Sequence, residues 1–163
     1  MKILSHSSNE TKKFAKLLAK KILAKPFDFS SALIIGLTGD LGSGKTTFIQ
    51  GFCKGVGIKK RITSPTFVLI KNYELRIMNY ERIYHIDCYR IQKPKELFKL
   101  GLKEIVGNPQ NIALIEWAEK LKKILPKKNV IWLKLKYGGK ENERKIIIKS
   151  NLKSKISNLQ FKI

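Results

Sequence analysis

The residues with the clearest chemical meaning in this chain form one short segment, in which glycines precede a lysine and two threonines. Its first eight positions match the pattern G-x-x-x-x-G-K-[ST] in full, as Gly39-Asp40-Leu41-Gly42-Ser43-Gly44-Lys45-Thr46. Glycines let such a loop curl so that several backbone N–H groups face one anion, and the following helix adds its positive N-terminal end. We therefore expect a phosphate-binding loop in which Lys45 neutralises the β- and γ-phosphates of a nucleotide and Thr46 ligates Mg²⁺. The simpler alternative is a glycine-rich turn with a lysine in solvent.

Two carboxylates stand at the ends of apolar segments, where a nucleotide site needs acidic groups. Glu116 closes the run 111–116, which has the form of a Walker B element, and Asp87 ends an alternating apolar run that begins at Tyr84. Sheets of α/β proteins bind ligands at the carboxyl ends of their strands. Either acid is therefore a candidate to hold Mg²⁺, directly or through water, or to orient the attacking water. A strand-end charge without a catalytic role is the alternative for each.

Three further positions allow both a functional and a structural interpretation. The hydroxyls of Thr63-Ser64-Pro65-Thr66 either reach a γ-phosphate or Mg²⁺ in the manner of a switch or serve only as the entry to a strand. Trp117 either lines the nucleotide site or packs in the core. A lone histidine such as His85 is more often a packed or surface residue than a functional one. The two cysteines and two histidines lack the spacing of a zinc site.

Local patterns around the loop predict the elements that would position it. Residues 32–37 form a short, continuous apolar run, which is typical of a buried strand in a parallel sheet. Residues 46–54, directly after the loop, predict a helix. Near the N-terminus, Ser7 and Glu10 form a capping box, which predicts that a helix of about residues 8–24 begins there.

The rest of the chain predicts a sheet with both parallel and antiparallel strands. Residues 66–73 and 83–89 are rich in β-formers and flank a polar segment, which predicts an antiparallel pair. We also expect a helix, a second buried strand and another strand pair, at residues 94–106, at 112–115 and at 130–135 with 145–149. This order predicts an α/β fold, namely a P-loop NTPase-like three-layer sandwich with a mixed, mainly parallel sheet and an antiparallel hairpin. Its length suits a single domain, residues 1–163.

The charge of the chain is strongly one-sided, with 34 Lys and Arg against 12 Asp and Glu and a formal net charge of +22. Such a balance is typical of proteins that neutralise nucleic-acid phosphates. However, 29 of the 34 basic residues are Lys, whereas base-edge and bidentate phosphate recognition favours Arg. Together with 22 Ile, this bias also fits a genome rich in A and T codons. Both a selected basic patch and compositional bias therefore explain the charge at this stage.

The sequence also bears on location. No apolar run approaches the roughly 20 residues that span a bilayer, and the N-terminus lacks the apolar segment of a signal peptide. Two cysteines, Cys53 and Cys88, do not make a disulfide framework. We expect a cytoplasmic protein without a membrane partner.

Four motifs, in this order and spacing, resemble the bacterial TsaE (YjeE) family over about residues 7–120. They are Gly-Asp-Leu-Gly-Ser-Gly-Lys-Thr-Thr at 39–47, Ser-Pro-Thr-Phe at 64–67, His-Ile-Asp-Cys-Tyr-Arg at 85–90 and Ile-Glu-Trp at 115–117. The resemblance implies a small ATPase that uses ATP and Mg²⁺ and is required to form threonylcarbamoyladenosine beside the anticodon of tRNA. It further implies binding to a TsaB–TsaD heterodimer, which ATP hydrolysis resets between turnovers. Transfer RNA is then reached indirectly, through that complex.

The resemblance also assigns roles by position. It makes Lys45, Asp87 and Glu116 catalytic, and it gives Mg²⁺ to Thr46 with Glu116, while Asp87 positions water or couples hydrolysis; the two acids could exchange roles. The implied nucleotide contacts are Gly39, Asp40, Leu41, Gly42, Ser43, Gly44, Lys45, Thr46, Thr47 and Trp117. Cys88 and Ala118 depart from the Leu and Pro usual in the family, and the Lys-rich surface is a larger departure.

Two other functions fit part of the pattern. A small-molecule P-loop kinase commonly clamps the transferred phosphoryl group with several Arg on a lid. Here the five Arg are scattered, at Arg61, Arg76, Arg82, Arg90 and Arg144. A basic nucleic-acid-binding module with a vestigial nucleotide site is the other alternative, and it predicts salt-dependent tRNA binding that ATP does not affect.

Overall fold

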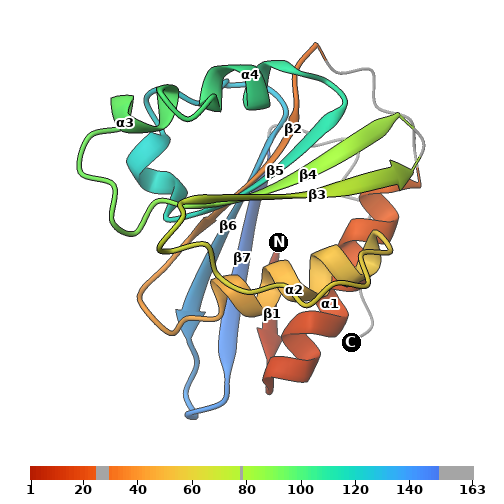
Figure 1. Ribbon diagram of the computed structural model, residues 1–163. Coiled ribbons are helices and arrows are strands. Elements are labelled where there is room, and N and C mark those ends of the chain that lie inside the picture. The colour runs from red at the N-terminus through yellow and green to blue at the C-terminus, as the bar shows by residue number, and fades with distance from the viewer. Residues whose placement is uncertain (25–29, 78, 151–163) are drawn as a thin grey trace.

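A seven-stranded mixed sheet forms the middle layer of the protein, in the order β1-β7-β6-β2-β5-β4-β3 (Figure 1). The structure is a computed structural model that describes residues 1–24, 30–77 and 79–150. The strands are β1 (Lys2–Ser5), β2 (Leu33–Thr38), β3 (Ile70–Ile77), β4 (Tyr80–Asp87), β5 (Asn111–Glu116), β6 (Val130–Tyr137) and β7 (Arg144–Ser150). The helices are α1 (Ser8–Leu23), α2 (Lys45–Gly55), α3 (Lys95–Phe98) and α4 (Leu102–Gly107), with a 3₁₀ turn η1 (Ala118–Leu121).

Parallel pairing is confined to the four central strands β6, β2, β5 and β4, and antiparallel strands flank them on both sides. The predicted mixed α/β sheet is confirmed, although parallel pairs make up half of the pairings rather than most of them. Because parallel strands end at one edge, the register places Leu37 beside Glu116 and Glu116 beside Asp87. The two predicted acids therefore come from adjacent strands at the edge where the loop leaves β2.

Helices cover both faces of the sheet, which gives the predicted three layers (Figure 1). On one face, α1 and α2 pack their apolar sides on the strands around Phe14, Phe48 and Phe52. On the other face, α3, α4 and η1 enclose a second cluster around Leu97 and Leu121. No helix among the described residues is long and apolar enough to cross a membrane.

The capping box at the start of α1 forms as predicted, with one difference. The Ser7 hydroxyl accepts a hydrogen bond from the Glu10 amide at 3.2 Å, while the Glu10 carboxylate accepts from the amide of His6, at 2.7 Å, rather than of Ser7. Helix α1 then packs closely against α2. A Cβ atom added to Gly51 of α2 would collide with the carbonyl oxygen of Lys12, so glycine is required for this close approach.

The predicted elements are found, and two of them differ clearly from the prediction. The strand expected at 66–73 begins only at Ile70, because the amides of Val68 and Leu69 both donate to the Pro65 carbonyl and close a turn. The helix expected at 94–106 is split into α3 and α4 at Gly101, whose φ of 82° ends the first helical segment. The edge strand β1 was not predicted, since it has four residues and pairs only with β7. Residues 151–163 of the predicted single domain lie outside the described residues.

Candidate nucleotide-binding site

The loop between β2 and α2 has the backbone geometry that its glycines suggest. Gly39 and Gly44 adopt φ values of 131° and 97°, which L side chains rarely adopt, and Gly44 is the N-cap of α2. A Cβ at Gly39 would also collide with the carbonyl oxygen of Leu135 in β6. The loop is therefore held against β6. The first residues of α2, Lys45, Thr46 and Thr47, line a cavity, as expected of a phosphate-binding loop at a helix N-terminus.

Lys45 bends back over this loop. Its Nζ atom donates to the carbonyl oxygens of Gly39 at 2.7 Å and Asp40 at 2.8 Å, and it lies 3.8 Å from the centre of the Trp117 ring. The residue is only 4% exposed, and burial lowers the pKa of the Lys45 ammonium, while Glu116 and neighbouring acids oppose that shift. The Lys45 ammonium thus lies, before any ligand binds, beside the loop where the charge of a phosphate would be neutralised.

Thr46, Glu116 and His85 form a continuous chain of hydrogen bonds. The Thr46 hydroxyl lies 2.8 and 3.0 Å from the two Glu116 carboxylate oxygens, and His85 Nε2 lies 2.8 Å from Oε1 of the same group. Glu116 is 3% exposed and His85 is fully buried. A carboxylate at this depth is stabilised only when it is paired or hydrogen-bonded, and both neighbours serve that purpose. His85 Nδ1 has no hydrogen-bond partner within the part of the chain that the structure describes.

Asp87 has a separate set of partners. Its Oδ2 accepts from the hydroxyls of Ser64 at 2.8 Å and Thr66 at 2.5 Å, and its Oδ1 accepts from the Tyr89 amide at 2.9 Å. Of the segment 63–66, for which two interpretations were open, the hydroxyls of Ser64 and Thr66 are thus directed at the second acid, whereas the Thr63 hydroxyl accepts from Lys71 Nζ at 2.7 Å. Because three donors fix one carboxylate, Asp87 has a defined orientation beside Glu116.

Trp117 turns the chain out of β5. It has a φ of 58°, uncommon for a bulky residue, and its half-buried ring contacts both Lys45 and the Tyr89 ring, whose centre is 5.2 Å away. The ring also packs against the second core cluster. Trp117 is therefore a packed residue that also lines the cavity described next.

These groups surround one cavity of about 350 Å³, lined by Leu41, Gly42, Gly44, Lys45, Thr46, Thr47, Ser64, Thr66, Asp87, Tyr89, Glu116 and Trp117. Three loop residues predicted to contact a nucleotide do not line it. Gly39 and Asp40 face a neighbouring cavity of about 660 Å³ beside Trp132, and the Ser43 side chain is fully buried. The loop acid Asp40 is thus separated from the pair Asp87 and Glu116.

Sequence reasoning gave too little weight to two residues of this site. Tyr89 lines the cavity, and His85 holds Glu116. A signal for His85 was present in the alternation of β4, since residues two positions apart in a strand share a face and His85 therefore lies on the side of Asp87. The contact itself depends on the neighbouring strand.

Comparison with known proteins then identifies the family. The family model described as threonylcarbamoyl adenosine biosynthesis protein TsaE matches residues 5–146. This chain belongs to the TsaE family. Among its TsaE relatives, those of Haemophilus influenzae and Bacillus subtilis are 36% and 40% identical over 141 and 134 residues, which are 86% and 82% of this chain and 82% and 77% of the relatives. The Rickettsia typhi protein is 44% identical over 124 residues, which are 74% of this chain and 76% of the relative.

A solved structure supports the fold of this TsaE-family chain. The crystal structure of Bacillus subtilis YdiB superposes with a TM-score of 0.69 at 29% identity, covering 96% of this chain and 89% of that one. The relatives carry the name tRNA threonylcarbamoyladenosine biosynthesis protein TsaE. The predicted family resemblance is confirmed, and the family match extends beyond residue 120, where the sequence motifs end.

The donor set of this TsaE-family site suits Mg²⁺ only together with a phosphate ligand. Within the described ranges, no three His, Cys, Asp or Glu side chains gather as a complete metal site. Thr46 and Glu116 supply one hydroxyl and one carboxylate next to the loop. Mg²⁺ is typically bound by one or two carboxylates, with water and substrate phosphates completing its octahedron. The residues present therefore fit a magnesium ion that arrives with a nucleotide.

Proposed function

We propose that this chain is a Mg²⁺-dependent ATPase that serves the formation of threonylcarbamoyladenosine in tRNA. The observation that carries the proposal is the hydrogen bond between Thr46, at the exit of the glycine loop, and Glu116, at the end of β5. It brings a phosphate-binding loop and a buried carboxylate together in one cavity. This pairing is what a P-loop enzyme needs in order to bind Mg²⁺ between protein and phosphates. The family name supplies the biological setting.

In this proposal, the loop amides and Lys45 hold the β- and γ-phosphates. Thr46 and Glu116 would hold Mg²⁺, which neutralises charge on the phosphate oxygens. Asp87 would position the water that attacks the γ-phosphorus, so that the bond to the leaving oxygen breaks and ADP and inorganic phosphate are released. The three donors to Asp87 support this role, because a water-positioning group must itself be fixed.

His85 would act as a positioning residue for Glu116. With its proton on Nε2, the buried imidazole donates to the carboxylate and fixes its orientation toward Thr46. Partners of this kind around a metal-binding carboxylate commonly determine both its orientation and its affinity for the ion. The role needs only a hydrogen bond from His85, which touches neither the phosphates nor the ion.

We further propose that a TsaB–TsaD heterodimer docks over the mouth of this cavity, and that tRNA is reached through the complex. Apolar side chains are exposed around the mouth, which supports a protein partner there. Leu41 and Tyr89 line the cavity itself, and Phe67, which is 83% exposed, and Val68 directly follow the lining residue Thr66. Arg90 lies 4.4 Å from the Phe67 ring centre and stacks on one side of it. Aromatic and arginine side chains are enriched at protein interfaces.

The test is ATP hydrolysis by the purified chain, measured with and without purified TsaB–TsaD heterodimer. We expect slow release of phosphate by the chain alone and faster release with the heterodimer, lost in Lys45→Ala. Transfer of the γ-phosphate to a nucleoside or metabolite rather than to water would favour a P-loop kinase and contradict the proposal. So would ATP hydrolysis that the heterodimer does not change.

A further inference from the structure

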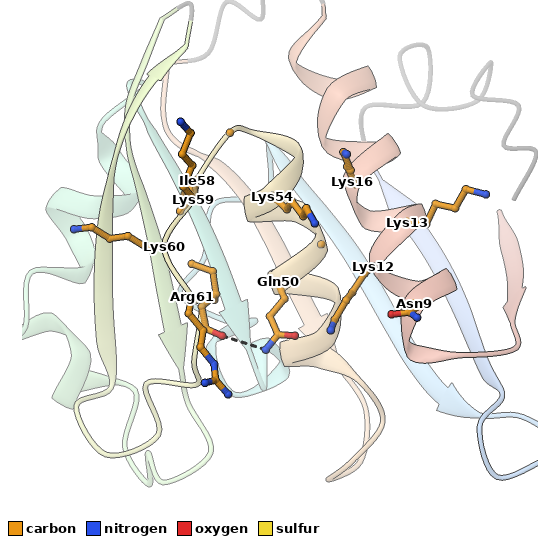
Figure 2. Close-up of a pocket in the computed structure, with 13 residues that line it drawn as sticks. Asn9, Lys12, Lys13, Lys16, Gln50, Lys54, Ile58, Lys59, Lys60 and Arg61 are labelled. Carbon is orange, nitrogen blue, oxygen red and sulfur yellow. Dashed lines mark hydrogen bonds between the residues drawn. The ribbon is translucent and has the colours of Figure 1, made fainter.

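A groove with a strongly basic lining lies along the two helices that cover one face of the sheet (Figure 2). It is formed by α1, α2 and the segment 57–62 that follows α2, and it encloses about 990 Å³. We call it the basic groove. Its lining residues are Asn9, Lys12, Lys13, Lys16, Gln50, Gly51, Lys54, Gly57, Ile58, Lys59, Lys60, Arg61 and Ile62.

The charge of the basic groove exceeds what the composition of the chain alone provides. Seven of its 13 lining residues are Lys or Arg and none is acidic, whereas Lys and Arg make up 34 of the 163 residues of the chain. None of these seven cations has a carboxylate partner within 4.0 Å among the residues that the structure describes. Compositional bias would spread lysines over every face. Their accumulation in one concave region, without counter-charges, indicates a binding surface for an anion.

The backbone beneath the basic groove is fixed. Gly51 and Gly55 let α2 approach α1 closely, since a Cβ at Gly55 would lie 2.7 Å from the Lys16 carbonyl oxygen. The 57–62 segment is tied to α2 by Gln50 Nε2, which donates to the Ile62 carbonyl at 3.1 Å, and by the Ile58 amide, which donates to Cys53. The cations thus project from three segments held together. Concave low-dielectric walls focus the field of such charges.

We propose that the basic groove binds the phosphate backbone of RNA directly, in addition to the route to tRNA through the heterodimer proposed above. Six of the seven cations are Lys, which acts as a point charge for phosphate rather than as a bidentate reader of base edges. The lining contains no aromatic side chain on which an unpaired base could stack. The expected ligand is therefore the backbone of a structured RNA, bound with little dependence on sequence.

A protein partner with an acidic face fits the basic groove less well. Protein interfaces are depleted in Lys and enriched in aromatic residues, Met and Arg. The basic groove has the opposite composition, in contrast to the apolar surroundings of the cavity mouth. The name of the TsaE relatives refers to the modification of tRNA, so RNA is a ligand class that suits a member of this family. RNA contact at the basic groove needs no ATP, so it goes beyond the function proposed above.

The test compares two triple variants of the full chain by fluorescence anisotropy with a labelled, unmodified tRNA transcript over a series of salt concentrations. The groove variant, Lys12→Gln with Lys54→Gln and Lys60→Gln, removes one charge from each of the three segments. The control variant, Lys95→Gln with Lys99→Gln and Lys123→Gln, removes three exposed charges in or shortly after α3 and η1, which lie on the other face of the sheet. Thermal unfolding of both variants verifies that they fold.

We expect the groove variant to bind tRNA more than about 10-fold more weakly than the parent at about 100 mM salt, with the control within about 3-fold. The slope of log K against log salt should become shallower by about 2 to 3 in the groove variant alone. A duplex RNA of unrelated sequence should bind the parent about as well as the tRNA does.

Equal losses in the two triple variants would overturn the proposal, because they would show that RNA senses only the overall charge. Binding of an acidic polyglutamate peptide that depends on the groove lysines, with RNA binding unaffected, would overturn it in favour of a protein partner. Measuring RNA binding with and without Mg²⁺ and ATP separates this proposal from the proposed ATPase function, because binding at the basic groove should not depend on either. RNA binding at the basic groove persists even if the chain fails to hydrolyse ATP.

Discussion

The candidate nucleotide site and the basic groove share helix α2 but hold their charges in opposite ways. In the site, Lys45, Glu116 and Asp87 are each less than 5% exposed and each has partners at hydrogen-bond distance. In the basic groove, seven cations lie exposed or half-buried without a carboxylate partner in the described part of the chain. Removing one partner of a buried charge leaves the other partner uncompensated, so each residue of the site should be essential for activity. Exposed like charges act through their sum, so single substitutions there should have small effects.

The largest expected effect is that of Lys45→Ala. Removing the buried ammonium leaves the phosphates without their main protein cation, and we expect ATP turnover to fall by about 10²- to 10³-fold, with much weaker ATP binding. Phosphate release and fluorescent nucleotide titration measure the two effects. Lys54→Ala is the matched control, because it removes an exposed lysine from the same helix. Equal turnover in the parent and Lys45→Ala would remove the basis of the comparison.

The two acids come next. Glu116→Gln and Asp87→Asn keep the size of each side chain but remove its charge, so Mg²⁺ and water lose their acidic partner. We expect each variant to lower ATP turnover by about 10²-fold while ATP binding weakens less. A Mg²⁺ titration separates the two residues, since Glu116→Gln should need more Mg²⁺ and Asp87→Asn should not. If both variants turn over ATP at near-parental rates, the assignment of the site fails.

Substitutions of His85 test whether activity also depends on a residue that supports Glu116 without lining the cavity. His85→Phe fills the same buried space but removes the donor to Glu116, so we expect about 10-fold slower turnover and a higher Mg²⁺ requirement. His85→Gln, which retains an N–H donor, should recover part of the loss. A merely structural role would predict a change in stability without a change in the Mg²⁺ requirement.

Tyr80→Phe is the control for that experiment. Tyr80 also lies on β4, and its buried hydroxyl has no hydrogen-bond partner among the described residues. Removing it should therefore leave ATP turnover unchanged and alter the free energy of unfolding by no more than about 0.5 kcal/mol. Loss of activity in both variants would show that β4 is sensitive to any substitution, and the specific role of His85 would be withdrawn.

The glycine loop and the positions of the two acids at strand ends could be predicted from sequence because each is a local pattern. The spacing of Gly39, Gly44 and Lys45 specifies the loop, and an apolar run that ends in Glu116 specifies a strand end. The TsaE family assignment follows from the order of four such patterns and is confirmed by the family match. What these predictions share is that they need no knowledge of which strands are neighbours.

The contacts that support these residues could not be predicted, because they depend on strand order. His85 meets Glu116 only because β4 pairs with β5 in parallel, which puts His85 opposite Leu114 and therefore within reach of Glu116 two positions further along β5. In the same way, Ser64 and Thr66 meet Asp87 only after Pro65 closes a turn. The split of the helix at 94–106 was within reach, since Gly101 was visible in its middle.

The smallest expected effect on activity concerns the glycine that joins the two regions. Gly51 lies where α2 touches α1, and it lines the basic groove. It belongs to the same helix as Lys45, the first residue of α2. Gly51→Ala would press a methyl group against the Lys12 carbonyl, so we expect the free energy of unfolding to fall by about 1–3 kcal/mol. ATP turnover of the folded protein should change by less than about 3-fold, because the loop is held by β6 rather than by α1.

Chemical denaturation measures the stability change, and Gly107→Ala is the control, since a Cβ at Gly107 meets nothing within 4 Å. The control should stay within about 0.5 kcal/mol of the parent. A Gly51→Ala variant as stable as the parent would mean that α1 moves away from α2 at little cost. The two helices that carry most of the groove lysines would then have no fixed spacing. The basic groove would not be a preformed surface, and its contrast with the buried site would fail.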